Sequence, residues 1–491
     1  MSELQMQLNA RTELSPAPLV LFVDGKGTLF AGDLLAESIL RAFKRNPLVL
    51  ILVLIWRLRG RAYLKYRLAN ISRLDANHLP YHAHVVEFLR QKRAKGYRLI
   101  LATECNLIYA RAIAAHLGFF DDVLASDTDL DLSGAAKRAA ILRYCQARGL
   151  DEFCYLGNVF SEIDVCIHAD DEFVVQRFGP GPVAVSTMVV PGRISPTVGL
   201  HFGAIVQAIR PHQWAKNLLV FVPIIVSHRL NNVGDLIGCM LAFGSFSTCA
   251  SAIYLFNDLF DIDSDRLHPQ KRHRPFASGK LPISHGLSLT AGLLSYAFLQ
   301  SWLFLPADLV LALLAYVVAN FAYTMVLKNK IIIDVVVLSS LYMLRILAGG
   351  IATGVVVSNW LLTFSLFIFA SLALAKRYSE LMTFPAGKDA PARVPGRGYR
   401  LGDAEVMGSI GTASGVSAVL VLALYIDSNQ VRLIYDNPHH LWLLCPLLLY
   451  WIARLWIIAR RGEAGDPVLF VVTDWPSKCL ALLSFLLIYW E

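Results

Sequence analysis

The stretch GDLIGCMLAFGSFSTCASAIYLF (residues 234–256) runs directly into NDLFDIDSD (residues 257–265). The first part is a mostly apolar run of 23 residues. A helix needs ~20 such residues to cross a hydrocarbon core. The second part gathers four aspartates and one asparagine within nine residues. The sequence therefore predicts a membrane-spanning helix that ends in a strongly acidic segment.

After about residue 200, similar apolar runs alternate with short polar breaks, and 56% of the whole chain is hydrophobic. Segments of this length span lipid as helices, because a helix satisfies all of its own backbone hydrogen bonds. We expect an all-α polytopic membrane bundle of nine transmembrane helices, of which the first and sixth are short. The expected spans are 217–229, 234–256, 285–304, 307–326, 331–354, 359–375, 407–427, 439–459 and 470–490.

The polar breaks differ in charge. Those after the second, fourth, sixth and eighth runs are basic, whereas the others hold few cations, such as Arg229 and Arg432. Basic loops stay in the cytoplasm, and the N-terminus has no signal-peptide apolar region of normal length. We expect a multi-pass protein of the cell (inner) membrane whose N-terminal domain is cytoplasmic. The net charge of +8 reflects this asymmetry, together with anchoring to anionic lipid, and does not indicate nucleic-acid binding.

The acidic segment has the pattern of a metal–diphosphate site. Asn257, Asp261 and Asp265 recur at every fourth residue, which on a helix places them along one face ~5–6 Å apart. Oxygen ligands at this spacing suit Mg²⁺ shared with a phosphate chain. The alternative is a solvated, acidic helix end. The basic residues that follow favour the metal site, because carboxylates, magnesium and cations together neutralise a departing diphosphate.

The same segment matches NDxxDxxxD, the signature of the UbiA prenyltransferase superfamily, and the resemblance covers residues 200–491. It implies a helical bundle with a central cavity open to the cytoplasm and to lipid. It also implies catalytic Asp258, Asp261 and Asp265 as magnesium ligands, with Asn257 orienting the diphosphate. Further segments resemble the polyprenyl-phosphate phosphoribosyltransferase branch of the superfamily: RPHQWAKN (210–217), HPQKRHRP (268–275), YTMVLK (323–328) and RGY (397–399).

Charge also favours that branch. A phosphoribosyl donor carries a diphosphate and a 5-phosphate, and a polyprenyl phosphate adds a third anionic group, so such a site needs cations beyond the metal. Arg345 is the most informative, since an arginine inside a membrane helix is costly and usually faces a cavity. The alternative for Arg345 is a structural ion pair with Asp334. The expected substrate-binding residues besides Asn257 are Lys216, Lys271, Arg272, Arg274, Tyr323, Lys328, Asp334, Arg345, Lys376 and Arg377.

The expected reaction transfers a 5-phosphoribosyl group from phosphoribosyl diphosphate to an isoprenoid lipid phosphate. One alternative is a prenyltransferase that ionises a polyprenyl diphosphate for attack by an aromatic or other small acceptor. That reading expects a second acidic motif after the sixth run, where the chain has the basic stretch KRYSE (376–380). A non-catalytic membrane scaffold is the third possibility, which the intact acidic segment disfavours. The lipid bilayer is an expected partner, and a homo-oligomer is compatible with the sequence.

The residues before the membrane region predict an α/β domain. Short apolar runs predict strands at 19–23, 98–102, 122–125, 153–157 and 172–175, with helical patterns between them. This alternation is typical of a parallel sheet whose active groups lie at the carboxyl ends of the strands. We expect domains at 1–178 and 201–491, joined by a linker at 179–200 that is rich in glycine and proline.

Residues 1–178 resemble the haloacid dehalogenase-like (HAD) phosphatase superfamily. Asp24 in DGKGT (24–28) matches the nucleophile, Thr103 and Lys137 match the second and third motifs, and GNVFSE (157–162) matches the fourth. Two residues depart from the pattern: Lys26 replaces the acid/base aspartate and Asn158 replaces a magnesium ligand. We expect Lys26 to pair with Asp24, and the domain to be inactive or weak and kept for folding, regulation or docking. The degenerate site comprises Asp24, Lys26, Thr103, Lys137, Asn158 and Glu162.

Residues 31–95 are expected to form a helical cap on this domain. Within the cap, residues 47–56 are nearly all apolar and are followed by Arg57, Arg59 and Arg61. Ten residues are too few to span a bilayer. Two interpretations stay open: a buried cap helix, and a helix that lies on the membrane surface.

Overall fold

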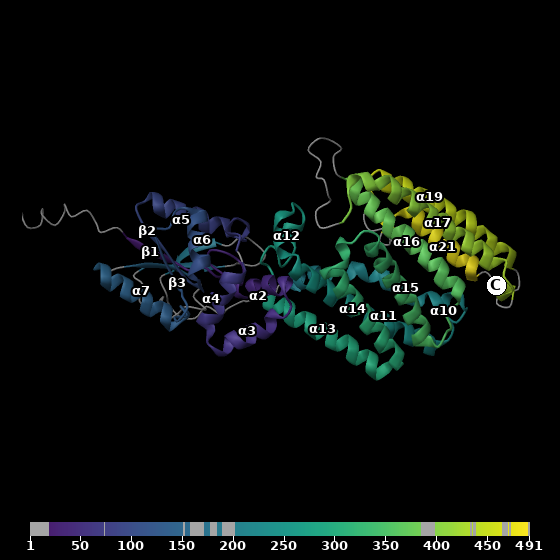
Figure 1. The fold of residues 1–491 in the computed structure, drawn as a ribbon, viewed down its shortest axis with the longest axis horizontal. Helices are drawn as coiled ribbons and strands as arrows, with labels where there is room; N and C mark the ends of the chain where they lie inside the picture. Colours follow the sequence, from purple (N-terminus) through teal and green to yellow (C-terminus); the bar gives the residue numbers. More distant parts are fainter. Residues whose placement is uncertain are drawn as a thin grey trace, which may run out of the picture. The chain divides into compact units, whose positions relative to one another are not determined.

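The structure, a computed structural model, describes residues 19–72, 74–150, 153–157, 171–176, 184–188, 202–383, 398–432, 435, 438–463, 470 and 473–489. The chain divides into two compact units (Figure 1). The first consists of Met1–Ala208 and Phe256–Ser288, and the second of Ile209–Leu255 and Leu289–Glu491. The acidic segment therefore belongs to the same unit as the N-terminal α/β residues.

The first unit is built on a six-stranded sheet in the order β3-β2-β1-β4-β5-β6. Strands β1 to β5 pair in parallel, as the sequence predicts, and β6 is antiparallel to β5. Strand β6 lies within residues 179–200, so the sheet continues into the stretch expected to be a linker. The strands are β1 (Val20–Val23), β2 (Arg98–Asn106), β3 (Asp122–Ser126), β4 (Cys154–Gly157), β5 (Asp171–Gln176) and β6 (Ala184–Met188).

Helices cover both faces of the sheet (Figure 1). Successive side chains of a strand point to opposite faces. Leu21 and Val23 of β1 pack in one cluster with α5 (Ala83–Ala94) and α6 (Leu107–Leu117). Val20 and Phe22 pack in another cluster with α7 (Ala135–Arg148). Because both faces are covered, β1 is apolar along its whole length, and Asp24 follows at its carboxyl end.

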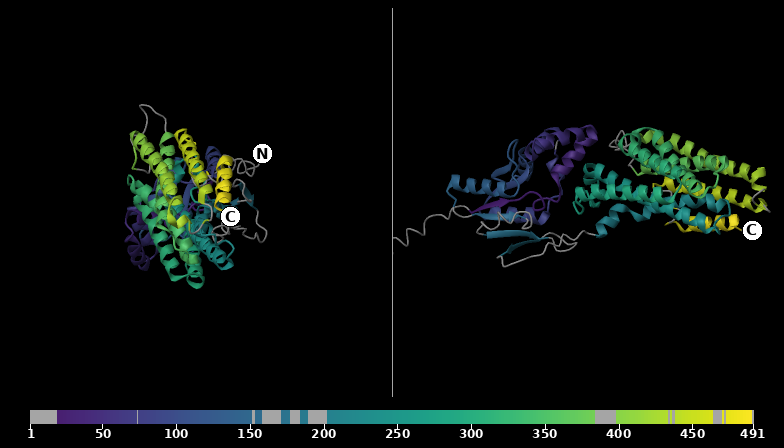
Figure 2. Two further views of the ribbon diagram at one scale, coloured as in Figure 1. Left: turned by 90° about the vertical axis from the view of Figure 1, so that its right-hand side faces the viewer. Right: turned by 90° about the horizontal axis from the view of Figure 1, so that it is seen from below.

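The predicted cap is helical, with α2 (Leu34–Arg45), α3 (Val49–Leu58), α4 (Arg61–Ile71) and the short 3₁₀ helix η1 (Ala76–His78) before α5. The side chain of Asp33 begins α2 by accepting hydrogen bonds from the backbone N–H groups of Leu35 and Ala36. Such a cap satisfies N–H groups that have no partner within the helix. Figure 2 shows the same unit from two further sides.

Helix α3 does not behave as a buried cap helix. Trp56 is buried and lies under the guanidinium of Arg67, at 5.1 Å from ring centroid to carbon. Leu54 is 68% exposed and Leu58 is 88% exposed, and most other apolar side chains of the helix are exposed as well. The buried-helix interpretation is therefore wrong for most of α3, whereas the membrane-surface interpretation stays a prediction.

The second unit is helical, and in it α16, α17 and α19 run side by side (Figures 1 and 2). Two long helices, α11 and α13, also extend into the first unit. Before them come α9 (Phe202–Ile209), the 3₁₀ helix η2 (Pro211–Phe221) and α10 (Val222–Val226). The long helices are α11 (Val233–Phe260), α13 (Ile283–Phe304), α14 (Ala307–Met325), α15 (Ile333–Thr353), α16 (Asn359–Met382), α17 (Ala404–Ile426), α19 (Leu444–Arg460) and α21 (Trp475–Tyr489).

Shorter turns connect these helices: η4 (Leu327–Asn329), η5 (Leu401–Asp403), α18 (Asn429–Arg432) and η6 (Pro438–Leu443). Within the described part of the chain, seven helices are long and apolar enough to cross a membrane. The chain is thus a multi-pass membrane protein, but the nine predicted spans are not confirmed. Residues 217–226 divide between η2 and α10, which begins at Val222 and has Pro223 in its first turn. Helix α21 has 15 residues.

Candidate active site

The acidic segment lies at the junction of two helices. Helix α11 ends at Phe260, and α12 (Ile262–Leu267) begins after Asp261. The backbone N–H of Asp261 donates to the carbonyl of Asn257 at 2.9 Å, and the N–H of Asp265 donates to the carbonyl of Asp261 at 2.8 Å. The four-residue spacing predicted from the sequence therefore continues across the junction.

Two of the three predicted metal ligands are drawn together by one arginine. Nη1 of Arg274 donates to Oδ1 of Asp258 at 3.1 Å and to Oδ2 of Asp265 at 2.8 Å. Both carboxylates are buried, whereas the arginine side chain is 26% exposed. Burial raises the pKa of Asp265, and the nearby carboxylates of Asp258 and Asp261 raise it further, although Arg274 opposes them. The segment is thus a concentration of negative charge that calls for a cation.

This donor set fits magnesium by its chemistry, since carboxylate and amide oxygens are the ligands that Mg²⁺ prefers. Among the described residues, no group of three or more His, Cys, Asp or Glu side chains has the arrangement of a formed metal site. In the structure the guanidinium of Arg274 lies between Asp258 and Asp265 and supplies the positive charge there. A divalent ion held by these carboxylates would replace that contact.

The loop after α12 brings further predicted cations to this part of the first unit. The 3₁₀ helix η3 (Lys271–His273) carries Lys271 and Arg272, and both side chains are exposed. Arg274 follows directly, and its carbonyl accepts hydrogen bonds from Ser278 Oγ and the Ser278 N–H. The loop therefore presents two exposed cations next to the arginine that bridges the carboxylates.

In the second unit, Arg345 of α15 is buried and hydrogen-bonded within the protein, and its role in binding substrate stays a prediction. Its Nε donates to Oδ1 of Asn217 at 2.7 Å, and Nη2 donates to the hydroxyl of Tyr316 at 2.9 Å. Nη1 donates to the carbonyl of Leu341 one turn earlier. The alternative of a structural ion pair with Asp334 is therefore wrong: the two residues lie 11 positions apart along one helix, and each has a nearer partner. Lys216, which precedes Asn217 in the sequence, is also buried.

Asp334 instead forms a second buried cluster with Arg377 of α16. Arg377 Nε donates to Asp334 at 2.8 Å, Nη1 contacts Glu380, and Nη2 donates to the hydroxyl of Tyr323 at 2.7 Å. Burial and the hydrogen bond to Asp334 raise the pKa of Tyr399, which therefore stays protonated and donates to that carboxylate. The guanidinium of Arg377 is thus engaged within the protein, whereas the sequence assigns it to substrate.

Sequence reasoning identified most of these residues but not their pairing. Asn217, Tyr316, Glu380 and Tyr399 were not predicted as site residues, although three of them stand in or beside segments that carry the family resemblance. Polar residues within apolar runs are the signal that could have found them. Lys328 and Lys376, also predicted to bind substrate, are half-buried.

In the degenerate phosphatase site, the residue at the nucleophile position already has a buried partner. Asp24 and Lys137 form a buried pair with an Nζ–Oδ1 distance of 2.8 Å. Thr103 is buried beside them, its Oγ1 next to Gly25. Asn158 and Glu162 lie outside the described residues.

The predicted pair of Lys26 with Asp24 is wrong. Lys26 reaches Asp33 at 2.8 Å and Glu104 at 3.6 Å, because these carboxylates lie at the surface where the long side chain can extend. Burial lowers the pKa of Lys26, but Asp33 and Glu104 outweigh it and raise that pKa. Lys26 therefore stays protonated near neutral pH and is no substitute for the acid/base carboxyl.

Comparison with known proteins finds a matching family in each of two regions of the chain. The profile of the UbiA prenyltransferase family matches residues 219–473, and that of haloacid dehalogenase-like hydrolases matches residues 21–155. The chain is similar to the uncharacterized protein y4nM of Sinorhizobium fredii, with 30% identity over 95% of this chain and 89% of that protein. It is also similar to the decaprenyl-phosphate phosphoribosyltransferase of Mycobacterium tuberculosis, with 37% identity over 57% of this chain and 90% of that protein.

Among solved structures, a UbiA homolog from Archaeoglobus fulgidus bound to DMAPP and Mg²⁺ is similar, with 16% identity and a TM-score of 0.45. It covers 58% of this chain and 97% of its own. The two family profiles match the N-terminal part and the membrane part of the sequence, as expected for the fusion inferred from the motifs.

Proposed function

Since this chain belongs to the UbiA prenyltransferase family and is a membrane transferase, we propose that it transfers a 5-phosphoribosyl group from phosphoribosyl diphosphate to a polyprenyl phosphate. The observation that carries this proposal is the cationic loop beside the acidic segment. Arg274 contacts Asp258 and Asp265, and Lys271 and Arg272 are exposed on the preceding turn. A donor with a diphosphate and a separate 5-phosphate needs such additional cations.

The roles of the residues follow from their chemistry. Asp258, Asp261 and Asp265 would hold Mg²⁺, which would supply positive charge to the departing diphosphate, and Asn257 would orient that group. Arg274, whose guanidinium is planar and carries several donors, would then bind a phosphate of the donor. Lys271 and Arg272 bind the remaining phosphate oxygens as charges that steer and hold the donor.

The proposed reaction breaks one bond at C1 of the ribose and forms another, and it needs no strong base. The bond between C1 of the ribose and the diphosphate oxygen breaks with oxocarbenium character, and diphosphate leaves with the electron pair. An oxygen of the lipid phosphate then forms a bond to C1. The acceptor is already an anion, so no proton has to be removed from it. Lys216, Lys328 and Lys376 keep the substrate-binding roles predicted from the sequence.

The relative from Mycobacterium tuberculosis supports the choice of substrates, because it is a decaprenyl-phosphate phosphoribosyltransferase and 90% of its length is matched. The last turns of α16 support it too. A second acidic motif, expected for a prenyl diphosphate, is replaced there by Lys376 and Arg377. We propose that the transferase domain begins near residue 201, as the sequence predicts, and that the N-terminal domain lies in the cytoplasm, on the side of the basic loops.

Two labelled donors test this function. Membranes that contain the chain are incubated with Mg²⁺ and polyprenyl phosphate plus radiolabelled phosphoribosyl diphosphate. In a parallel reaction, they receive labelled polyprenyl diphosphate and an aromatic acceptor. We expect label in the lipid product only from the phosphoribosyl donor. Transfer of the prenyl label to the aromatic acceptor, with no ribose label in lipid, would establish the prenyltransferase alternative instead.

A further inference from the structure

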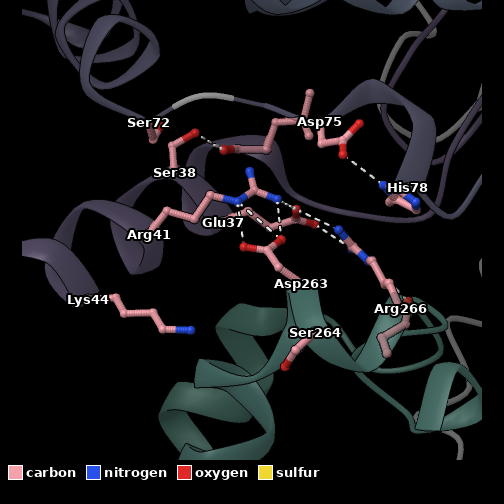
Figure 3. A network of polar contacts seen from close by, with 12 residues as sticks. Glu37, Ser38, Arg41, Lys44, Ser72, Asp75, His78, Asp263, Ser264 and Arg266 are labelled. Atoms are coloured by element: carbon pink, nitrogen blue, oxygen red, sulfur yellow. Dashed lines mark hydrogen bonds and ion pairs between the residues drawn. The ribbon is translucent and has the colours of Figure 1, made fainter. Parts of the chain in front are cut away.

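Helix α2 of the N-terminal domain is bound to α12 by two adjacent ion pairs (Figure 3). Glu37 accepts two hydrogen bonds from the guanidinium of Arg266, at 2.8 and 3.0 Å. The side chain of Glu37 is 2% exposed and that of Arg266 is 6% exposed. Two parallel hydrogen bonds between an arginine and a carboxylate fix direction as well as distance. This pair therefore sets how α12 is oriented on α2.

Arg41 makes the second ion pair, one turn further along α2. Its Nε and Nη2 donate to the carboxylate of Asp263 at distances between 2.7 and 3.2 Å, and Nη2 also contacts Glu37. In Figure 3 these four side chains meet between the two helices. Residues 37 and 41 lie on one face of α2 because they are one helical turn apart.

The end of α11 is held by the same helix. Lys44 donates to the carbonyl of Phe260 at 3.2 Å, one of the last carbonyls of α11, which have no partner within the helix. The ring of Phe43 meets that of Phe260 edge to face, with centroids 5.6 Å apart. Helix α2 thus contacts the chain on both sides of Asp261.

Arg266 extends the contact to the loop that carries Arg274. Its Nε donates to the carbonyl of Ala277 at 3.3 Å. In the same loop, Gly279 has a φ of 72° and lies against the backbone after β1, where an added Cβ would be 2.5 Å from Cβ of Ala31. A continuous series of contacts therefore runs from Glu37 through Arg266 and the loop to Arg274, and from there to Asp258 and Asp265.

We propose that the N-terminal domain holds the diphosphate site of the transferase in its working geometry, with Glu37 and Arg41 as positioning residues. Helix α12 has six residues, and helices this short are not stable alone. Its Asp263 and Arg266 bind the N-terminal domain, while its Asp265 turns to Arg274. A buried ion pair contributes little net stability compared with apolar packing, which favours a role in fixing geometry. The proposal rests on the function proposed above for the acidic segment.

The test uses the full chain in membranes and measures the Mg²⁺ concentration that gives half-maximal transfer. Residues that orient metal ligands typically change metal affinity or activity about 10- to 100-fold when they are replaced. We expect Glu37→Gln to raise the half-maximal Mg²⁺ concentration about tenfold, because Arg266 loses its counter-charge. Arg41→Asp, which places like charges opposite Asp263, is expected to do the same. Glu87→Gln and Arg111→Asp alter exposed residues of the same domain and serve as matched controls.

A charge exchange separates positioning from loss of folding. The double variant R41D/D263R restores opposite charges across the contact, so we expect it to recover most of the Mg²⁺ affinity that Arg41→Asp loses. A Mg²⁺ dependence unchanged from the wild type in both single variants overturns the proposal, and so does a double variant no better than Arg41→Asp. The assay uses whichever labelled donor the wild type accepts. A wrong donor thus overturns the proposed substrate, and not the positioning role.

Discussion

Two of the clusters in which an aspartate meets a cation differ in how far that cation can be reached from solvent. In the N-terminal domain Asp24 is paired with Lys137, and both side chains are almost fully buried. In the acidic segment Asp258 and Asp265 share Arg274, whose side chain is 26% exposed. The buried Lys137 neutralises Asp24 from within, so we call this cluster the closed site. Arg274 is partly exposed to solvent, so we call its cluster the open site. The two clusters thus differ in the burial of the cation and not in the presence of aspartates.

The largest expected effect concerns the closed site. Asp24→Asn removes the negative partner of a buried lysine, and breaking such a pair costs about 3–5 kcal/mol. We expect the free energy of unfolding of the N-terminal domain to fall by that amount, measured by proteolysis of the full chain across a urea series. Asp129→Asn, at an exposed position, is the control. A variant domain as stable as the wild type would show that the buried Asp24–Lys137 pair does not contribute the expected free energy.

A substitution in the open site is expected to lower the rate of transfer. Asp261→Asn removes one predicted metal ligand. Metal ions stabilise transition-state charge by several kcal/mol, so transfer should fall about a hundredfold or more. The measurement is the initial rate of label transfer to lipid at saturating Mg²⁺. Lys26→Gln alters an exposed side chain of the degenerate phosphatase site and should leave the rate of transfer within about twofold of the wild type. Equal rates for Asp261→Asn and the wild type would remove the acidic segment from the mechanism.

The exposed cations next to the open site should affect donor binding. Lys271→Ala and Arg272→Ala each remove one charge-assisted contact to a phosphate, weakened by solvent. We expect the KM for the donor to rise about threefold to tenfold while kcat changes less. Lys280→Ala removes an exposed cation of the same loop to which we assign no phosphate, and should not change KM. If all three variants behave alike, the loop acts through its net charge and not through particular residues.

The smallest expected effect is a change in how the stability of the N-terminal domain depends on pH. It concerns the ion pair of Lys26 with Asp33. Burial raises the pKa of Asp33, but the hydrogen bond and charge of Lys26 outweigh it and hold that pKa below its ordinary value. A group whose pKa is lowered on folding stabilises the fold above its unfolded pKa, about 4, and loses that contribution as the pH falls through the folded value.

For a largely exposed pair we expect about 0.5–1 kcal/mol. Asp33→Asn keeps a side chain able to cap α2 but removes the charge. It should therefore be less stable than the wild type at pH 7 and equally stable below about pH 3. Urea unfolding at the two pH values measures the difference. An equal difference at both would mean that the pair with Lys26 contributes nothing through charge.

The sequence predicts the elements that depend on local pattern. The five parallel strands follow from short apolar runs, and the acidic segment follows from its four-residue spacing. The ion pairs between α2 and α12 were not predictable, because Glu37 and Arg266 are 229 residues apart along the chain. No periodicity connects such positions, and each alone reads as an ordinary charge on a helix.

Apolar content alone was not enough to predict the structure of two segments. Residues 217–229 are apolar enough to suggest a span, yet Asn217 within them is buried against Ser247 and Arg345, and a new helix begins at Val222. Residues 47–56 are equally apolar, but the domain covers only Val49 and Trp56 fully. Hydropathy measures how poorly a segment interacts with water and does not say what covers it.

The central claim, that the acidic segment expels diphosphate from a phosphoribosyl donor, is tested most directly by following two phosphorus labels. Phosphoribosyl diphosphate labelled at the 5-phosphate or at the terminal phosphate of the diphosphate is incubated with the chain, polyprenyl phosphate and Mg²⁺. We predict that the 5-phosphate label enters the lipid fraction while the diphosphate label stays in water, and that the 5-phosphate label no longer enters lipid when Mg²⁺ is chelated. Recovery of the diphosphate label in lipid, or no lipid label from either donor, would contradict the account.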